Sequence, residues 1–172
     1  MTTDYILHKE LEKVLDLLTP GNKLAMKVAI ATGLRISDVL NLKREKLARQ
    51  FWIVEQKTGK KRRVNLTGEL LEQLLQHSEG SPWAFPGRNP MRHRQRQTVW
   101  KDVKRAQKAF RLVENLGTHT ARKVYAAEMF DRYGDLRRVQ RALNHDSMEV
   151  TALYAMADQL TRRRLARRKK AR

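Results

Sequence analysis

The sequence contains no cysteine. This absence excludes disulfide bonds, thiolate zinc sites and a cysteine nucleophile, so packing has to stabilise the fold. No apolar run approaches the roughly 20 residues that a membrane-spanning helix needs. The first residues also lack the apolar core and small-residue cleavage site of a signal peptide, and internal repeats are missing. We therefore expect a cytoplasmic protein that does not insert into a membrane.

Acidic residues are scarce relative to basic ones. The 172 residues include 37 lysines and arginines against 18 aspartates and glutamates, which gives a formal net charge of +19. Such an excess goes beyond the needs of solubility and indicates a polyanionic partner, with nucleic acid first and an anionic membrane surface as the alternative. The length suits one sizeable core. We predict a single domain over residues 1–172, with a basic tail at about residues 159–172 that adds phosphate attraction.

The apolar pattern predicts a mainly helical α+β fold with one small antiparallel β-hairpin. Leucines recur at helical spacing from Leu7 to Leu18, which predicts an opening helix. Gly33 is the kind of residue that commonly ends a helix, and it follows the predicted helix at residues 23–32. The segment FWIV at residues 51–54 has the β-branched and aromatic character of a strand. The predicted strands cover residues 51–54 and 63–66. The predicted helices cover residues 7 to about 20, 23–32, 37–42, 69–76, 98–112, 120–133, 136–143 and 148–156.

Four short segments carry side chains suited to phosphate chemistry. They are ATGLR at residues 31–35, KTGK at residues 57–60, HTAR at residues 119–122, and NH at residues 144–145 with Tyr154 nine residues later. Together they supply two guanidiniums, an amine, two imidazoles and a phenol. These groups suffice to cut and reseal a phosphodiester, and paired guanidinium donors stabilise the charge on the non-bridging oxygens.

Tyr154 is the candidate nucleophile. Its phenol has an ordinary pKa of about 10 and needs nearby cations or a base to ionise as it attacks. Lys57, at the predicted hairpin tip, is suited to protonate the leaving 5′-oxygen. Each residue alone is also compatible with packing or with a solvated surface. Their common order and spacing favour the chemical interpretation.

At this point the sequence resembles the catalytic domain of the tyrosine recombinase (phage integrase) family. The matches are residues 31–38, Lys57, residues 119–122, and residues 143–145 with Tyr154, within a span of about residues 23–158. The resemblance implies that Tyr154 breaks one DNA strand and leaves a 3′-phosphotyrosyl link and a free 5′-hydroxyl. It also implies a bacterial or phage mobile-element context.

The resemblance assigns roles to individual residues. Since the phosphotyrosine conserves the bond energy, it implies neither a metal nor another cofactor. It implies double-stranded DNA as the partner, and dimers and tetramers on DNA that exchange strands through a Holliday junction. The implied catalytic residues are Arg35 and Arg122 as phosphate clamps, Lys57 as general acid with Lys60 as a weaker substitute, His119 as proton-transfer and phosphate partner, His145 as a second phosphate donor, and Tyr154 as nucleophile.

Three departures from the family pattern stand out. Asn144 replaces the usual glycine, Asp38 replaces a frequent glutamate, and the usual N-terminal DNA-binding domain is expected to be absent. The chain is then either an excised catalytic domain or a short single-domain recombinase. Basic residues between positions 88 and 111 are predicted to lie along DNA, mostly on phosphates. The predicted DNA contacts are Lys60, Arg92, Arg94, Arg96, Lys101, Lys104, Arg105 and Lys108.

Two other functions remain open from the sequence. A type IB-like topoisomerase uses a similar set of side chains, and rapid relaxation of a supercoiled plasmid without a recombination site would favour it. A non-catalytic DNA-binding accessory factor could keep the fold without the chemistry. That function predicts a biological activity that survives Tyr154→Phe.

Overall fold

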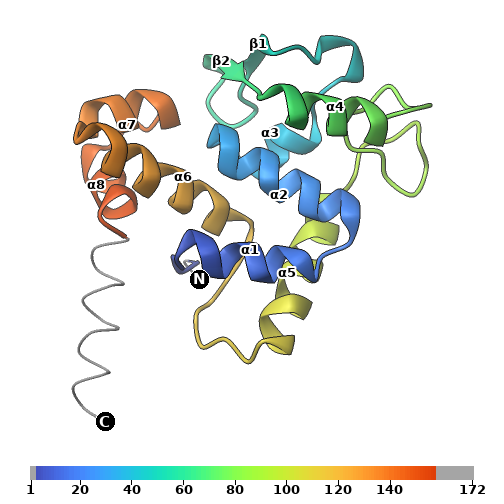
Figure 1. Ribbon diagram of the computed structural model, residues 1–172. Coiled ribbons are helices and arrows are strands. Elements are labelled where there is room, and N and C mark those ends of the chain that lie inside the picture. Colours follow the sequence, from blue (N-terminus) through green and yellow to red (C-terminus); the bar gives the residue numbers. More distant parts are fainter. Residues whose placement is uncertain (1–2, 158–172) are drawn as a thin grey trace.

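The computed structural model describes residues 3–157, and helices dominate it (Figure 1). The predicted basic tail at residues 159–172 lies outside the described residues. The mainly helical α+β fold with one small antiparallel sheet is confirmed. In chain order the elements are α1 (His8–Asp16), α2 (Pro20–Thr32), α3 (Ile36–Leu40), a 3₁₀ turn (Arg44–Lys46), β1 (Gln50–Val54), β2 (Lys61–Asn65), α4 (Gly68–His77), α5 (Arg96–Ala109), α6 (Thr118–Tyr133), α7 (Leu136–Leu143) and α8 (Met148–Ala155).

Helix α2 is the centre of the main core. It packs against α1, α3, α4, α5 and α6, and nearly all of its side chains except the lysines are buried. A helix that is apolar on every side belongs inside a fold. The sequence predicted its start at Lys23, but it begins at Pro20, because proline fits the first turn, where the helix needs no backbone N–H.

A second, smaller apolar cluster joins α7 and α8 to the end of α6. Ala126, Val139 and Leu143 are fully buried there. Figure 1 shows α7 and α8 together beyond the helices of the main core, with α6 leading into them. Because α6 starts against α2 and ends in this cluster, it fixes the last two helices relative to the core.

Two left-handed residues end helices beside the candidate site. Gly33 ends α2 with φ 66°, and a Cβ there would lie 2.3 Å from the ring of Tyr125. Asn144 ends α7 with φ 49°. Asparagine tolerates this conformation better than most residues with a side chain, so the departure from glycine keeps the same turn. Both positions therefore favour residues that tolerate a left-handed backbone.

The hairpin and most helix limits follow the prediction. Gln50 pairs with Asn65 and Val54 with Lys61 across the two strands, and the Thr67 side chain caps α4. Helix α5 begins and ends earlier than predicted, at Arg96–Ala109, since Phe110 and the left-handed Arg111 already form its closing turn. Among residues 3–157 no helix combines the length and apolarity needed to cross a membrane.

Candidate active site

Arg122 links three of the four sequence segments. It lies in the first turns of α6 and is almost completely buried. Its Nη1 donates to the carbonyl of Gly33 at 2.6 Å, and its Nη2 donates to the carbonyl of Leu143, just before Asn144. Burial and the nearby charges of Arg35 and Arg62 lower its pKa to about 10, so it remains a cation at neutral pH.

Arg35 lies in the turn between α2 and α3 and is held by a buried acid. Its Nη1 donates to Oε2 of Glu55 at 2.5 Å. Burial alone would raise the pKa of Glu55, but hydrogen bonds from Arg35 and Thr58 and the charges of Arg35 and Arg62 outweigh burial and lower this pKa. Glu55 therefore stays ionised, and Arg35 is oriented before any substrate binds.

Sequence reasoning missed both Glu55 and Arg62. Arg62 lies in β2 on the same buried face as Val64, and Glu55 directly follows β1. An arginine at an inward-facing strand position, opposite the strand that leads to an acid, is a local sign of a buried ion pair. The predicted strands, at residues 51–54 and 63–66, stopped short of both residues, so the sequence pattern did not reveal the pair.

His145 and Tyr154 face each other across the junction of α7 and α8. Their ring centroids are 5.3 Å apart and the rings are perpendicular. Burial, then the charges of Arg122 and Arg35, lower the pKa of His145 to about 4. The Thr151 hydroxyl donates to the carbonyl of Ser147 at 3.0 Å and lies 3.2 Å from Nδ1 of His145. That hydroxyl therefore accepts from Nδ1–H, and the neutral ring keeps a free lone pair on Nε2.

A cation also lies against the candidate nucleophile. The Nζ atom of Lys123 is 5.3 Å from the ring centroid of Tyr154 and donates to the backbone carbonyl of Thr3. Lys123 directly follows Arg122 in α6, so one turn of this helix carries both the clamp guanidinium and the cation beside the phenol. Lys123 lies just outside the four sequence segments.

The two remaining predicted catalytic residues are His119 and Lys57. His119 occupies the first turn of α6 and stays accessible. Partial burial lowers its pKa, and the charges of Arg122 and Arg96 lower it further, so the neutral imidazole is favoured. Lys57 is exposed at the hairpin tip, and within the described part of the chain its amine has no hydrogen bond or ion pair. The structure thus groups Arg35, Arg122, His145 and Tyr154 closely, and leaves Lys57 on a separate tip.

Three residues predicted to contact DNA have internal partners. Arg94 is half-buried and donates to Asn22 Oδ1 at 2.8 Å and to the carbonyl of Pro86. Lys104 donates to Gln107 at 2.8 Å, and Arg105 donates to Asp102 at 2.7 Å. These bonds give the three side chains structural partners, but Arg105 still exposes 59% of its side chain, and all three stay predicted DNA contacts.

The other predicted DNA contacts are also exposed. Lys60 forms an exposed ion pair with Asp146, which bridges the hairpin tip and the α7–α8 junction. Because the rest are exposed, they stay predicted DNA contacts. These are Arg92, Arg96, Lys101 and Lys108.

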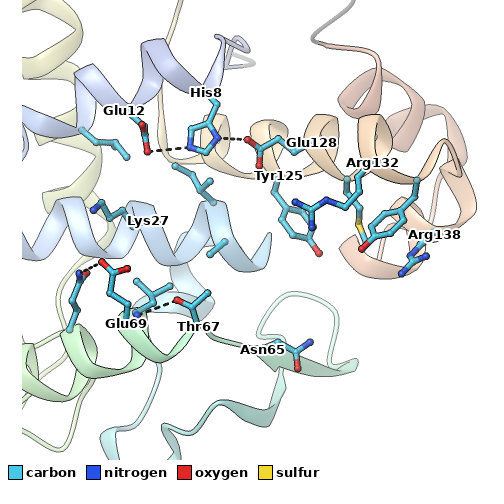
Figure 2. A pocket seen from close by; sticks show the side chains of 17 residues that line it. His8, Glu12, Lys27, Asn65, Thr67, Glu69, Tyr125, Glu128, Arg132 and Arg138 are labelled. Carbon is cyan, nitrogen blue, oxygen red and sulfur yellow. Dashed lines mark hydrogen bonds and ion pairs between the residues drawn. The ribbon is translucent and has the colours of Figure 1, made fainter.

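A cleft of about 650 Å³ lies elsewhere, between α1, α2, α4 and α6 (Figure 2). Tyr125 points into it from α6, and His8 bridges Glu12 and Glu128 on its wall. It holds none of the six predicted catalytic side chains. Its lining balances three carboxylates, Glu12, Glu69 and Glu128, with three cations, Lys27, Arg132 and Arg138. The cleft is therefore set apart from the predicted chemistry by the catalytic side chains that it lacks.

Solved structures of recombinases share this fold. The XerA recombinase structure aligns with a TM-score of 0.72 at 19% identity, over 95% of this chain and 66% of that one. A lambda integrase fragment, crystallised as a dimer bound to a COC′ core site, aligns with a TM-score of 0.72 at 23% identity, over 88% of this chain and 59% of that one.

Curated relatives match the same region of the sequence. Tyrosine recombinase XerD of Rhizobium meliloti (strain 1021) is 31% identical over 139 residues, which cover 75% of this chain and 45% of the relative. The probable integrase/recombinase YoeC of Bacillus subtilis (strain 168) is 30% identical over 139 residues, which cover 78% of this chain and 76% of the relative. The chain thus spans about half the length of the XerD relative.

The match to a family model extends over almost all of the described chain. The model of the Phage integrase family covers residues 4–160, from before α1 to beyond α8. It includes each of the segments that meet around Arg122. With its fold and its relatives in agreement, the chain belongs to the phage integrase family of tyrosine recombinases.

Proposed function

We propose that the chain is the catalytic domain of a site-specific DNA recombinase or integrase that cuts and rejoins strands through a 3′-phosphotyrosyl intermediate. The observation that carries this proposal is the grouping of Tyr154 and His145 with the arginines of two other segments, linked by the bonds of Arg122 to Gly33 and Leu143. Around this group the formal charge is positive, as a phosphodiester requires.

In the proposed reaction, Arg35 and Arg122 bind the non-bridging oxygens of the scissile phosphate. The phenolic oxygen of Tyr154 attacks phosphorus, and the bond from phosphorus to the 5′-oxygen breaks. The phenolic proton passes to the neutral imidazole of His119, and Lys57 protonates the leaving 5′-oxygen. His145 donates to the phosphate once the substrate charge offsets the repulsion that lowers its pKa. Resealing reverses these steps with a 5′-hydroxyl as nucleophile.

The proposed role of Lys57 depends on its position at the hairpin tip, where its exposed amine is accessible to bound DNA. The tip is anchored by main-chain bonds at Glu55 and held near the α7–α8 junction by Lys60. An exposed amine on a short turn is suited to follow the DNA backbone. We include Lys57 as general acid on this basis.

Duplex DNA and further copies of the chain are the proposed partners. Among the related structures, XerH is bound to a difH substrate and lambda integrase forms a dimer on its core site. The exposed basic residues of α5 and the preceding loop supply the sequence-independent phosphate contacts. We further propose the bacterial or phage-infected cytoplasm as the site of action, and residues 1–172 as one catalytic domain.

The test is covalent trapping on DNA. A duplex selected from a random pool for binding to the chain is nicked next to the cleavage position, so that the short product diffuses away and the adduct persists. We expect an adduct with the wild-type chain and none with Tyr154→Phe, which still binds. Relaxation of a supercoiled plasmid without that sequence would favour a topoisomerase. Binding without any adduct would favour the accessory factor.

A further inference from the structure

Glu55 is the most deeply buried acid beside the candidate site. Its side chain has no exposed surface, and both of its carboxylate oxygens accept from neighbours. Oε2 accepts from Arg35 at 2.5 Å and from the Thr58 hydroxyl at 3.0 Å, and Oε1 accepts from Arg62 at 3.4 Å. A buried carboxylate with two guanidinium partners is a costly feature unless it organises its surroundings.

The contacts of Glu55 continue to the other clamp residue. Arg62 also donates to the carbonyl of Thr32 and, at 3.3 Å, to that of Gly33. The Gly33 carbonyl accepts from Arg122 at 2.6 Å as well. One network therefore runs from Arg35 through Glu55, Arg62 and the end of α2 to Arg122.

The formal charges of this network are balanced for an anion. The three guanidiniums of Arg35, Arg62 and Arg122 face the carboxylates of Glu55 and Asp38. The site thus keeps a net positive charge, which suits a phosphodiester. Without Glu55 the guanidiniums would repel one another with less compensation in a poorly solvated place.

We propose that Glu55 is a positioning residue that sets the Arg35 guanidinium for the scissile phosphate. This inference rests on the proposed function of the same site. Glu55 engages only Nη1 of Arg35, and within residues 3–157 the rest of that guanidinium has no hydrogen bond. Its remaining N–H groups are thus available to a phosphate while the group stays fixed. Preorganised donors need no reorientation during the reaction.

Glu55 also connects the clamp to the hairpin tip that carries Lys57. Thr58, the next residue, donates to the same Oε2 atom that binds Arg35. The main chain of Glu55 closes the turn, since its N–H donates to Lys60 and its carbonyl accepts from Gly59. A change in Glu55 therefore disturbs the clamp and the proposed general acid together.

Two variants and a matched control test this role. Glu55→Gln keeps the size of the side chain and removes its charge, Thr58→Val removes one hydrogen bond and keeps the charge, and Glu79→Gln alters an exposed glutamate outside the network. The readouts are the Kd for the selected DNA and the rate of adduct formation at saturating DNA. We expect Glu55→Gln to bind at least as tightly as wild type, because the site becomes more positive. Its adduct rate should fall on the order of 10²-fold, as for a misplaced catalytic group.

Thr58→Val should show a smaller loss of rate with unchanged Kd, and it decides the question if Glu55→Gln does not fold. Glu79→Gln should match wild type in both readouts. A wild-type adduct rate for Glu55→Gln, or for Thr58→Val where only that variant folds, would overturn the inference. A fall in binding parallel to the fall in rate would also overturn it, because that pattern indicates a merely structural role.

A nitrogen-15 NMR spectrum of the arginine guanidiniums separates this inference from the proposed function. In the wild-type chain the ion pair should restrict rotation of the Arg35 guanidinium, and Glu55→Gln should release it. Thr58→Val keeps the ion pair but removes a bond that orients the carboxylate, so it should increase this rotation by a smaller amount. If the wild-type chain forms no adduct, the proposed function fails, and these spectra still decide the role of Glu55. If the Arg35 signal of the tested variant matches that of the wild-type chain, the positioning role of Glu55 is refuted.

Discussion

His145 should make a large contribution to the pH dependence of stability in the mildly acidic range. The ordinary pKa of the group is 6.5, and burial with the charges of Arg122 and Arg35 lowers it to about 4 in the folded protein. The unfolded chain therefore binds a proton more readily than the folded chain. The stability that this difference contributes is complete above pH 6.5 and is lost as the pH falls toward 4.

The size of the effect follows from these two pKa values. The difference between them limits the total loss of folding free energy to about 3.4 kcal/mol, since each pKa unit is worth about 1.36 kcal/mol. Acidification from about pH 7.5 to about pH 5 removes about 2 kcal/mol of it. Such a loss is a large fraction of the stability of a typical domain.

Urea unfolding of the wild type and of His145→Gln at these two pH values measures the contribution of His145 to the free energy of unfolding. Glutamine does not titrate and can still donate to the Thr151 hydroxyl, so other acid-sensitive groups affect both proteins equally. We expect the wild-type free energy of unfolding to drop by about 2 kcal/mol more than that of the variant. Equal drops in the two proteins would refute the assignment of a neutral, charge-repelled imidazole to His145.

Four further substitutions probe the fold and the basic surface. Gly33→Ala should destabilise the fold by about 2 kcal/mol or more, by chemical denaturation, because a Cβ at φ 66° is strained and meets the Tyr125 ring. Arg94→Ala should cost about 2 kcal/mol in the same assay by leaving buried acceptors unpaired, whereas Arg92→Ala, on the exposed loop, should leave stability unchanged. Lys101→Ala should weaken DNA binding for all sequences alike and reduce the slope of log Kd against log salt by about 1; a sequence-dependent loss would contradict a phosphate contact.

Local signals predicted those parts of the fold that depend on local physics. Helix α7 has the predicted limits because Gly134 and Asn144 are marked breaks on either side of it. The hairpin was recognisable from β-branched residues flanking a turn. Pro20 was misread as a stop, although proline is as suitable for a first turn as for the residue after a last one.

Tertiary partners decided what local signals left open. Arg92 and Arg94 look alike in a basic loop, and only the position of Asn22 shows that one of them is structural. The segments of the candidate site were identifiable from their order, but the acid that holds Arg35 was not. Its importance arises from burial and from Arg62 on the opposite strand, neither of which a motif records.

The most direct test of the account is the identity of the residue that becomes linked to DNA. The chain contains four tyrosines, and Tyr154 alone among them lies against both His145 and Lys123. Trapped adduct is digested with a protease, and the DNA-linked peptide is sequenced by mass spectrometry. We predict a single phosphotyrosyl peptide modified at Tyr154. Linkage to Tyr125 or Tyr133, or to a serine, would contradict the proposed site.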